Sequence, residues 1–286
     1  MPQYGIAAWC VDSASVGEDV FAAAARQGLA SVHFPVDTED AVARLAQPVW
    51  RAAVERRCRE TGVCISSLAL NIAERTPLCG SSADVNSRRR FHHVVLAALE
   101  FASEVKVPLV YVPSFGLAEI TSNDDLRETA DLLGRATESA CSFGIEMASE
   151  NSLGPAGTER LIEYVGQENF RILFDIYNPR RWGHCPTEII EAGFTAFATQ
   201  IHIKDGRLPG YGNAPLGAGD GEIVEIVQNL LRRGFDGIFV LENGYGNVSG
   251  LDVKSDLETL RLICDRSHLI AARGTALIDG GQHAGS

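Results

Sequence analysis

The sequence contains no long hydrophobic run, and this absence excludes a membrane-spanning helix. None of its apolar stretches reaches the roughly 18–20 residues that are needed to cross a bilayer. The first residues, MPQYGIAAWC, also lack the basic start and the apolar stretch of a secretory signal. We therefore expect a cytoplasmic protein with no membrane partner.

Paired cysteines and excess positive charge are absent as well. The seven cysteines are scattered singly and no Cys-x-x-Cys occurs, so neither a zinc ribbon nor a redox pair is expected. The formal net charge is −12, and an acidic surface repels a phosphate backbone. The one dense basic run, Arg88–Arg90, is too short to outweigh that balance. We expect a small metabolite as the partner and no nucleic acid.

Eight short β-rich runs alternate with helical stretches along the chain. Residues 40–61 and 87–105 show the helical period most clearly, and Gly28, Gly62, Gly144 and Gly234 each lie where a helix would end before a strand. The expected strands are Tyr4–Trp9, Ser31–Phe34, Cys64–Leu70, Leu109–Pro113, Glu146–Glu150, Arg171–Asp175, Gln200–Ile203 and Gly237–Glu242.

This alternation predicts an α/β fold with a parallel sheet that closes into a (β/α)8 TIM barrel. A doubly wound sheet is the rival, but no Gly-x-Gly-x-x-Gly follows an early strand, and the LGAGDG run at 216–221 comes late. No shift in composition divides the chain. We expect one barrel domain over residues 1–272 and a flexible tail over 273–286, since the end of the chain is rich in small residues and lacks periodicity.

Four metal-competent side chains lie at the ends of consecutive expected strands: Glu150, Asp175, His202 and Glu242. The carboxyl ends of barrel strands converge on one face, where active sites are built. Three carboxylates there carry a charge of about −3, which needs a cation, a proton or a basic partner. Any one of the four is equally consistent with a loop anchor, but the full set indicates a divalent metal site. Oxygen ligands with one imidazole favour Mn²⁺, with Mg²⁺ or Co²⁺ as alternatives, over zinc.

The strings around these residues resemble the xylose isomerase-like TIM barrel superfamily, in its sugar phosphate isomerase/epimerase family. The resemblance extends over about residues 4–270 and is specific only as a set: ASEN at 148–151, LFDIYN at 173–178, QIHIKD at 200–205 and FVLENG at 239–244. It implies a metal-dependent isomerase or epimerase of a small ketose or keto-polyol, acting through a metal-bound cis-enediolate. Glu150 and Glu242 would be the acid/base pair, and the handedness of the substrate would decide which of them is the base. Homodimers and homotetramers are common in that family.

The resemblance leaves other functions open. A dehydratase of a cyclic keto-polyol such as an inosose would use the same four ligands, and a non-catalytic sugar-binding barrel would have little need for two opposed glutamates. An apurinic endonuclease would need further histidines, whereas the third and fourth strands lead into Asn71 and Ser114. That absence and the acidic charge argue against a DNA-repair enzyme.

Further side chains are candidates for substrate contact. Asn178 stands where related epimerases often have histidine, and His184 follows in the same loop. Arg207, after His202, matches an arginine that contacts substrate oxygens in related epimerases. His33 is either a substrate contact or a core histidine. The aromatic candidates for the pocket wall are Trp9, Phe34, Phe115 and Trp182.

A phosphate on the substrate is not indicated by the sequence. Arg207 and Lys204 are placed to bind one, but no glycine nest at a helix start marks a phosphate site. We therefore expect an unphosphorylated substrate.

Overall fold

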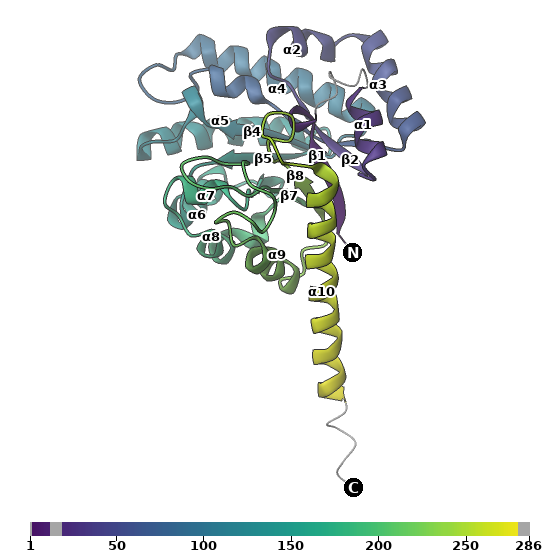
Figure 1. The fold of residues 1–286 in the computed structure, drawn as a ribbon. Helices are drawn as coiled ribbons and strands as arrows, with labels where there is room; N and C mark the ends of the chain where they lie inside the picture. The colour runs from purple at the N-terminus through teal and green to yellow at the C-terminus, as the bar shows by residue number, and fades with distance from the viewer. Residues whose placement is uncertain (1, 12–18, 280–286) are drawn as a thin grey trace.

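A computed structural model of the chain describes residues 2–11 and 19–279. Eight parallel strands lie at the centre, and the helices surround them (Figure 1). The strands are β1 (Gln3–Ala7), β2 (Ser31–Pro35), β3 (Cys64–Ala69), β4 (Leu109–Ser114), β5 (Glu146–Asn151), β6 (Phe170–Ile172), β7 (Gln200–Ile203) and β8 (Ile238–Leu241).

The strand order closes the sheet on itself. The order is β6-β5-β4-β3-β2-β1-β8-β7, so β1 pairs with both β2 and β8. The two ends of this order meet through parallel bridges between Ile172 and Phe197 and between Asp175 and His202. The predicted single (β/α)8 barrel is thus confirmed.

The helices cover the outside of the barrel. One stretch with a continuous helical pattern in the sequence, residues 40–61, forms two helices instead of one. Residues 40–61 form two helices because Pro48 begins the second one, and proline has no N–H with which to continue the first. Gly62 ends the second helix with a φ of 72°, as the glycine pattern predicts. The helices are α1 (Val20–Arg26), α2 (Glu39–Leu45), α3 (Pro48–Thr61), α4 (Val85–Val105), α5 (Asn123–Cys141), α6 (Pro155–Val165), α7 (Asn178–Arg181), α8 (Pro186–Gly193), α9 (Ile223–Arg232) and α10 (Val253–Asp279).

Four strands, β1, β3, β6 and β8, are shorter than the sequence predicts, and the differences at β1 and β6 move Trp9 and Asp175 off the strands. β1 ends at Ala7, and Trp9 lies on the short 3-10 turn η1 (Ala8–Cys10) that follows. β6 ends at Ile172, and Asp175 makes only the isolated bridge to His202.

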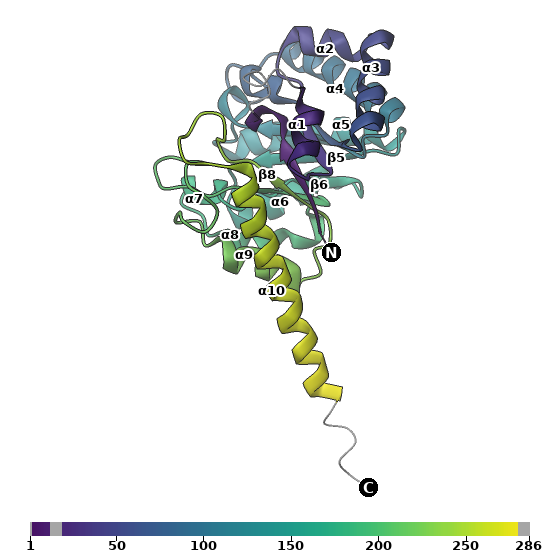
Figure 2. The same cartoon turned by 45° about the vertical axis from the view of Figure 1, so that its right-hand side comes forward.

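The last helix extends past residue 273, where the sequence predicts the start of a tail. α10 continues to Asp279, and it packs on α9 and β8 before it extends beyond the barrel (Figures 1 and 2). Residues 280–286 lie outside the described residues. Among the described residues, no helix is both long enough and apolar enough to cross a bilayer.

Candidate metal centre and active site

The four strand-end residues come together at the carboxyl end of the barrel. One ligand atom from each of Glu150, Asp175, His202 and Glu242 can be chosen so that all four atoms lie within 4.8 Å of one another. Glu150, Asp175 and His202 are buried, and Glu242 is partly buried. Carboxylates this close repel one another strongly in a low-dielectric environment. The cluster therefore suits a divalent cation.

Asp175 is held so that one of its oxygens remains available. Its Oδ1 accepts hydrogen bonds from the backbone N–H groups of Tyr177 (2.8 Å) and Asn178 (2.6 Å) at the start of α7. Its buried Oδ2 makes no hydrogen bond, although the Lys204 ammonium lies 2.9 Å away. Burial raises the pKa of Asp175 to about 6, against the opposing effect of Lys204. A buried carboxylate oxygen that is engaged only by an ion pair, beside an imidazole and two further carboxylates, fits a metal ligand.

Lys204 provides a fixed positive charge inside the cluster. It follows His202 by two residues, directly after the end of β7 at Ile203, and both side chains reach the carboxylates of the cluster. Lys204 is buried, and its Nζ lies 2.7 Å from Glu242 Oε2. Three ionised carboxylates and one ammonium leave a charge of about −2, which a divalent cation would neutralise.

A buried hydrogen-bond chain behind His202 determines which of its ring nitrogens carries a proton. Gln200 Nε2 donates to the carbonyl of Ser66 (2.6 Å), so Gln200 Oε1 accepts from His33 Nε2 (2.5 Å). Burial holds the pKa of His33 well below its usual value, and neutral His33 then offers only Nδ1 as an acceptor. That atom lies 3.0 Å from His202 Nε2, which must be the donor.

The other nitrogen of His202 faces the carboxylates. Its Nδ1 lies 3.2 Å from Glu242 Oε2 and 3.4 Å from Glu150 Oε1. Burial lowers the pKa of His202, but the two glutamates outweigh burial and raise that pKa to about 10. Burial likewise raises the pKa of Glu242, yet His202 and Lys204 bring it well below the usual value. Without a metal, the imidazolium is the counter-ion of the glutamates.

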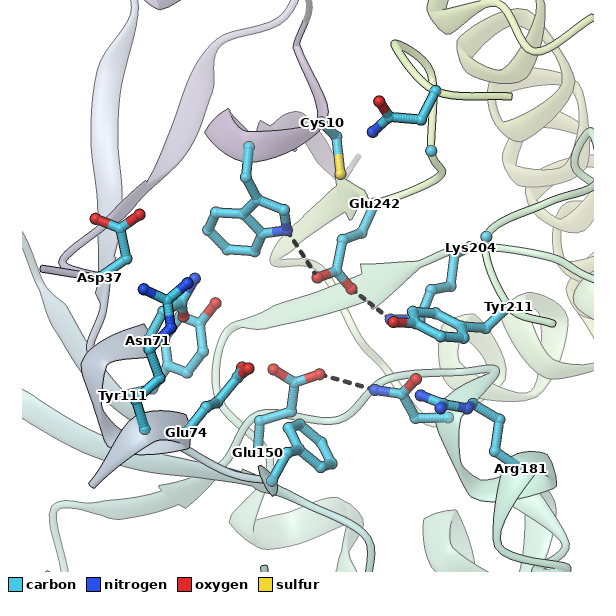
Figure 3. A pocket seen from close by; sticks show the side chains of 17 residues that line it. Cys10, Asp37, Asn71, Glu74, Tyr111, Glu150, Arg181, Lys204, Tyr211 and Glu242 are labelled. Atoms are coloured by element: carbon cyan, nitrogen blue, oxygen red, sulfur yellow. Dashed lines mark hydrogen bonds and ion pairs between the residues drawn. The ribbon is translucent and has the colours of Figure 1, made fainter. Parts of the chain in front are cut away.

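The two glutamates face each other across the cavity, each held by a neighbouring side chain (Figure 3). Trp9 Nε1 donates to Glu242 Oε1 (3.2 Å), and Asn178 Nδ2 donates to Glu150 Oε1 (3.0 Å). Both carboxylates therefore reach into the same cavity from different sides.

The cavity has a volume of about 470 Å³, within the range of small-molecule sites. Three of the expected substrate contacts, Trp9, Phe115 and Asn178, line it. Its other lining residues, which come mainly from the loops after the strands, are Cys10, Asp37, Asn71, Glu74, Arg75, Tyr111, Glu150, Arg181, Lys204, Tyr211, Gly212, Glu242, Gly244 and Asn247.

Five other candidates do not line the cavity: Phe34, Trp182, His33, His184 and Arg207. His33 is fully buried, and its Nδ1 lies 3.0 Å from His202 Nε2, as for the core histidine that the sequence left as the alternative. His184 lies in a separate surface hollow with Gly154 and Trp182. Arg207 is exposed, and its guanidinium donates to the carbonyl of Ala218 (2.6 Å).

Arg181 and Tyr211 were not predicted as parts of this site, and Lys204 was considered only as a ligand for a phosphate. The alternation of β7 from His202 was a signal for Lys204, because every second residue points inward. Arg181 follows Asn178 by three residues, a helical spacing that puts both on one side of α7. No local signal identifies Tyr211, whose position depends on the path of the loop after β7.

Comparison with known proteins assigns the chain to a family of TIM barrel proteins. The profile of the family described as "Xylose isomerase-like TIM barrel" matches residues 21–263. The chain is 38% identical over 207 residues to 2-epi-5-epi-valiolone 7-phosphate 2-epimerase from Actinoplanes sp., across 71% of this chain and 73% of that protein.

Two solved structures show the same fold at lower sequence identity. The structure of an L-ribulose 3-epimerase matches 100% of both chains, with a TM-score of 0.74 and 16% identity. A xylose isomerase-like TIM barrel protein from Mycobacterium smegmatis, in complex with magnesium, matches 87% of each chain, with a TM-score of 0.65 and 15% identity.

Proposed function

We propose, from the premise that the chain belongs to the xylose isomerase-like TIM barrel family, that it is a metal-dependent epimerase or isomerase of a small ketose or keto-polyol. The observation that carries this proposal is the position of Glu150 and Glu242. These two members of the cluster face each other across the cavity. The name of the 38% identical relative describes an epimerase of a polyhydroxy ketone, which supports the same class of reaction.

The residues of this chain account for a proton transfer between two faces of a substrate. A divalent cation held by the cluster would polarise two adjacent substrate oxygens and acidify the C–H bond between them. One glutamate removes that proton to give a cis-enediolate, and the other glutamate returns a proton to the opposite face. Trp9 and Asn178 keep the two carboxylates in place, and Phe115 contributes an apolar wall that helps to exclude water.

Mn²⁺ is the cation that we propose first, with Mg²⁺ and Co²⁺ as alternatives. The donor set has three carboxylates and a single imidazole, and such oxygen-rich sites suit these ions better than they suit zinc. Asn178 and Trp9 also line the cavity, so we propose that they contact the substrate as well as the glutamates.

The test is a panel of ketoses and cyclic keto-polyols, assayed in D₂O with each metal after chelation of the purified protein. An epimerase incorporates deuterium from the solvent at the inverted carbon without loss of water. Appearance of an enone absorbance from a cyclic ketone would instead identify a dehydratase.

Two variants test the acid/base pair. Glu150→Gln and Glu242→Gln should each lower kcat by roughly 10²–10⁴-fold. Glu146→Gln is the matched control, because Glu146 lies at the opposite end of β5, where it pairs with Arg171. Activity that survives both single changes, at saturating metal, would show that the assignment is wrong.

A further inference from the structure

Planar side chains form a row beside the cavity. The rings of Phe115 and Trp182 stack, with centroids 5.5 Å apart and planes at 18°. The Arg181 guanidinium lies 4.9 Å from the centroid of the Trp182 ring and 3.8 Å from that of Tyr211. Trp182 Nε1 donates to Glu119 Oε1 (2.9 Å), which fixes the indole. Arg181 is therefore held in place by contacts with two aromatic rings.

Arg181 has no carboxylate partner among the described residues, although other cations near it do. Arg180 pairs with Glu222, and Lys204 is occupied by Asp175 and Glu242. In Figure 3, Arg181 and Tyr211 lie on the Lys204 side of the cavity, whereas Asp37 lies on the opposite side. Because aromatic rings contact the guanidinium, its N–H edges are the part left free to bind a ligand.

We infer that Arg181 binds a phosphate monoester on the substrate, an inference that rests on the proposed function. The guanidinium presents several donors in a fixed fork that matches phosphate oxygens. Asn178, which donates to Glu150, precedes Arg181 by three residues on α7, so one turn of this helix carries both a partner of the acid/base pair and the proposed phosphate ligand.

Two further observations support a phosphorylated substrate. Arg75 also lines the cavity, so its guanidinium adds to the positive charge that an anionic substrate would meet there. The 38% identical relative is named for a 7-phosphate. The sequence indicated no phosphate because it has no glycine nest, but a stacked arginine is a side-chain site that needs no such nest.

The kinetic test compares a phosphorylated ketose or keto-polyol with its unphosphorylated counterpart, in the metal-loaded full chain. Arg181→Met should raise KM for the phosphorylated compound by roughly 10- to 100-fold, with a smaller change in kcat. KM for the unphosphorylated compound should rise much less than KM for the phosphorylated one. The matched control is Arg180→Met, which removes a neighbouring guanidinium that does not line the cavity and should leave both KM values within about twofold.

A calorimetric titration with inorganic phosphate separates this inference from the proposed function. The original protein and Arg180→Met should bind phosphate, and Arg181→Met should bind it at least about tenfold more weakly. Equal affinity in all three proteins, or equal KM changes for both substrates, would overturn the phosphate site. Absence of turnover with either compound would overturn the proposed function, and the phosphate titration would still decide whether Arg181 binds the anion.

Discussion

His202 carries a proton on each ring nitrogen in the metal-free protein at neutral pH. Its pKa of about 10 lies above the usual value of 6.5, so the second proton is held until the pH approaches 10. A metal ligand must be a neutral imidazole, and the chain through His33 keeps the proton on Nε2. The proton that is displaced by a metal is therefore the one on Nδ1, which faces Glu150 and Glu242.

We predict that metal binding at pH 7.5 releases about one proton from His202. Since protonation competes with the metal below pH 10, apparent affinity should rise by up to about tenfold per pH unit from pH 7 to 9. Calorimetry in two buffers with different ionisation enthalpies measures the released proton. Heats that do not depend on the buffer would contradict this account.

His33 should matter for metal affinity although it does not touch the metal site directly. His33→Leu removes the acceptor for His202 Nε2–H, so the imidazole loses its fixed orientation and apparent metal affinity should fall by roughly 10- to 100-fold. His93→Leu is the matched control, because His93 is exposed on α4. Equal metal affinities in the two variants, with unchanged circular dichroism, would show that the chain behind His202 has no such role.

Among single residues, the sequence identified those whose side-chain chemistry and position on a strand can both be read from a short stretch of sequence. Glu150, Asp175, His202 and Glu242 are of that kind, because strand ends of a barrel converge on one face. His184 and Arg207 do not line the cavity, because a loop can carry a side chain away from the mouth of the barrel. The Arg207 side chain instead contacts the carbonyl of Ala218.

The loop after β7 is organised around one buried carboxylate, that of Asp205. Its two oxygens accept hydrogen bonds of 2.8–3.0 Å from the backbone N–H groups of Gly206, Gly217, Gly219 and Gly221. The LGAGDG run, which the sequence alone suggested was only a loop, is thus wrapped around this side chain. The backbone approaches so closely that a Cβ at Gly219 would collide with Asp205.

We predict that Asp205→Ala destabilises the protein by about 3 kcal/mol or more, because the substitution leaves several buried N–H groups without partners. Urea unfolding of the metal-loaded protein measures the change. Asp131→Ala is the control, since Asp131 forms only an exposed pair with Arg135 on α5, and its effect should be within about 0.5 kcal/mol. A similar small effect at both positions would mean that the loop is not held by Asp205.

Helix and strand boundaries could be predicted best where they depend on residues within the same segment. The break between α2 and α3 follows from Pro48 and could have been predicted from that residue alone. The early end of β6 could not have been predicted from the sequence, because it depends on which neighbouring strands pair with these residues. Leu173 N–H bonds to Ser149 on β5, whereas Ile176 N–H bonds to His202 on β7.

The barrel as a whole is closed by residues that also belong to the candidate metal centre. Strand count and spacing predicted closure, but they gave no indication of where the weakest junction lies. That junction is between β6 and β7, where the two isolated bridges replace a continuous ladder. One bridge joins Asp175 to His202, and it includes a hydrogen bond of 3.0 Å from His202 N–H to the carbonyl of Phe174.

Metal binding should therefore protect this junction more than the rest of the barrel. A cation held by Asp175 and His202 ties the two sides together, so the amides of His202 and Ile176 should exchange more slowly with solvent when Mg²⁺ is added. Amides in the pairing between β4 and β5, which is continuous from Leu109 to Ser114, should change less. Hydrogen exchange with and without chelator measures both sets. Uniform protection over all eight strands would mean that the metal stabilises the fold only globally, whereas selective protection would show that the ligands also close the barrel.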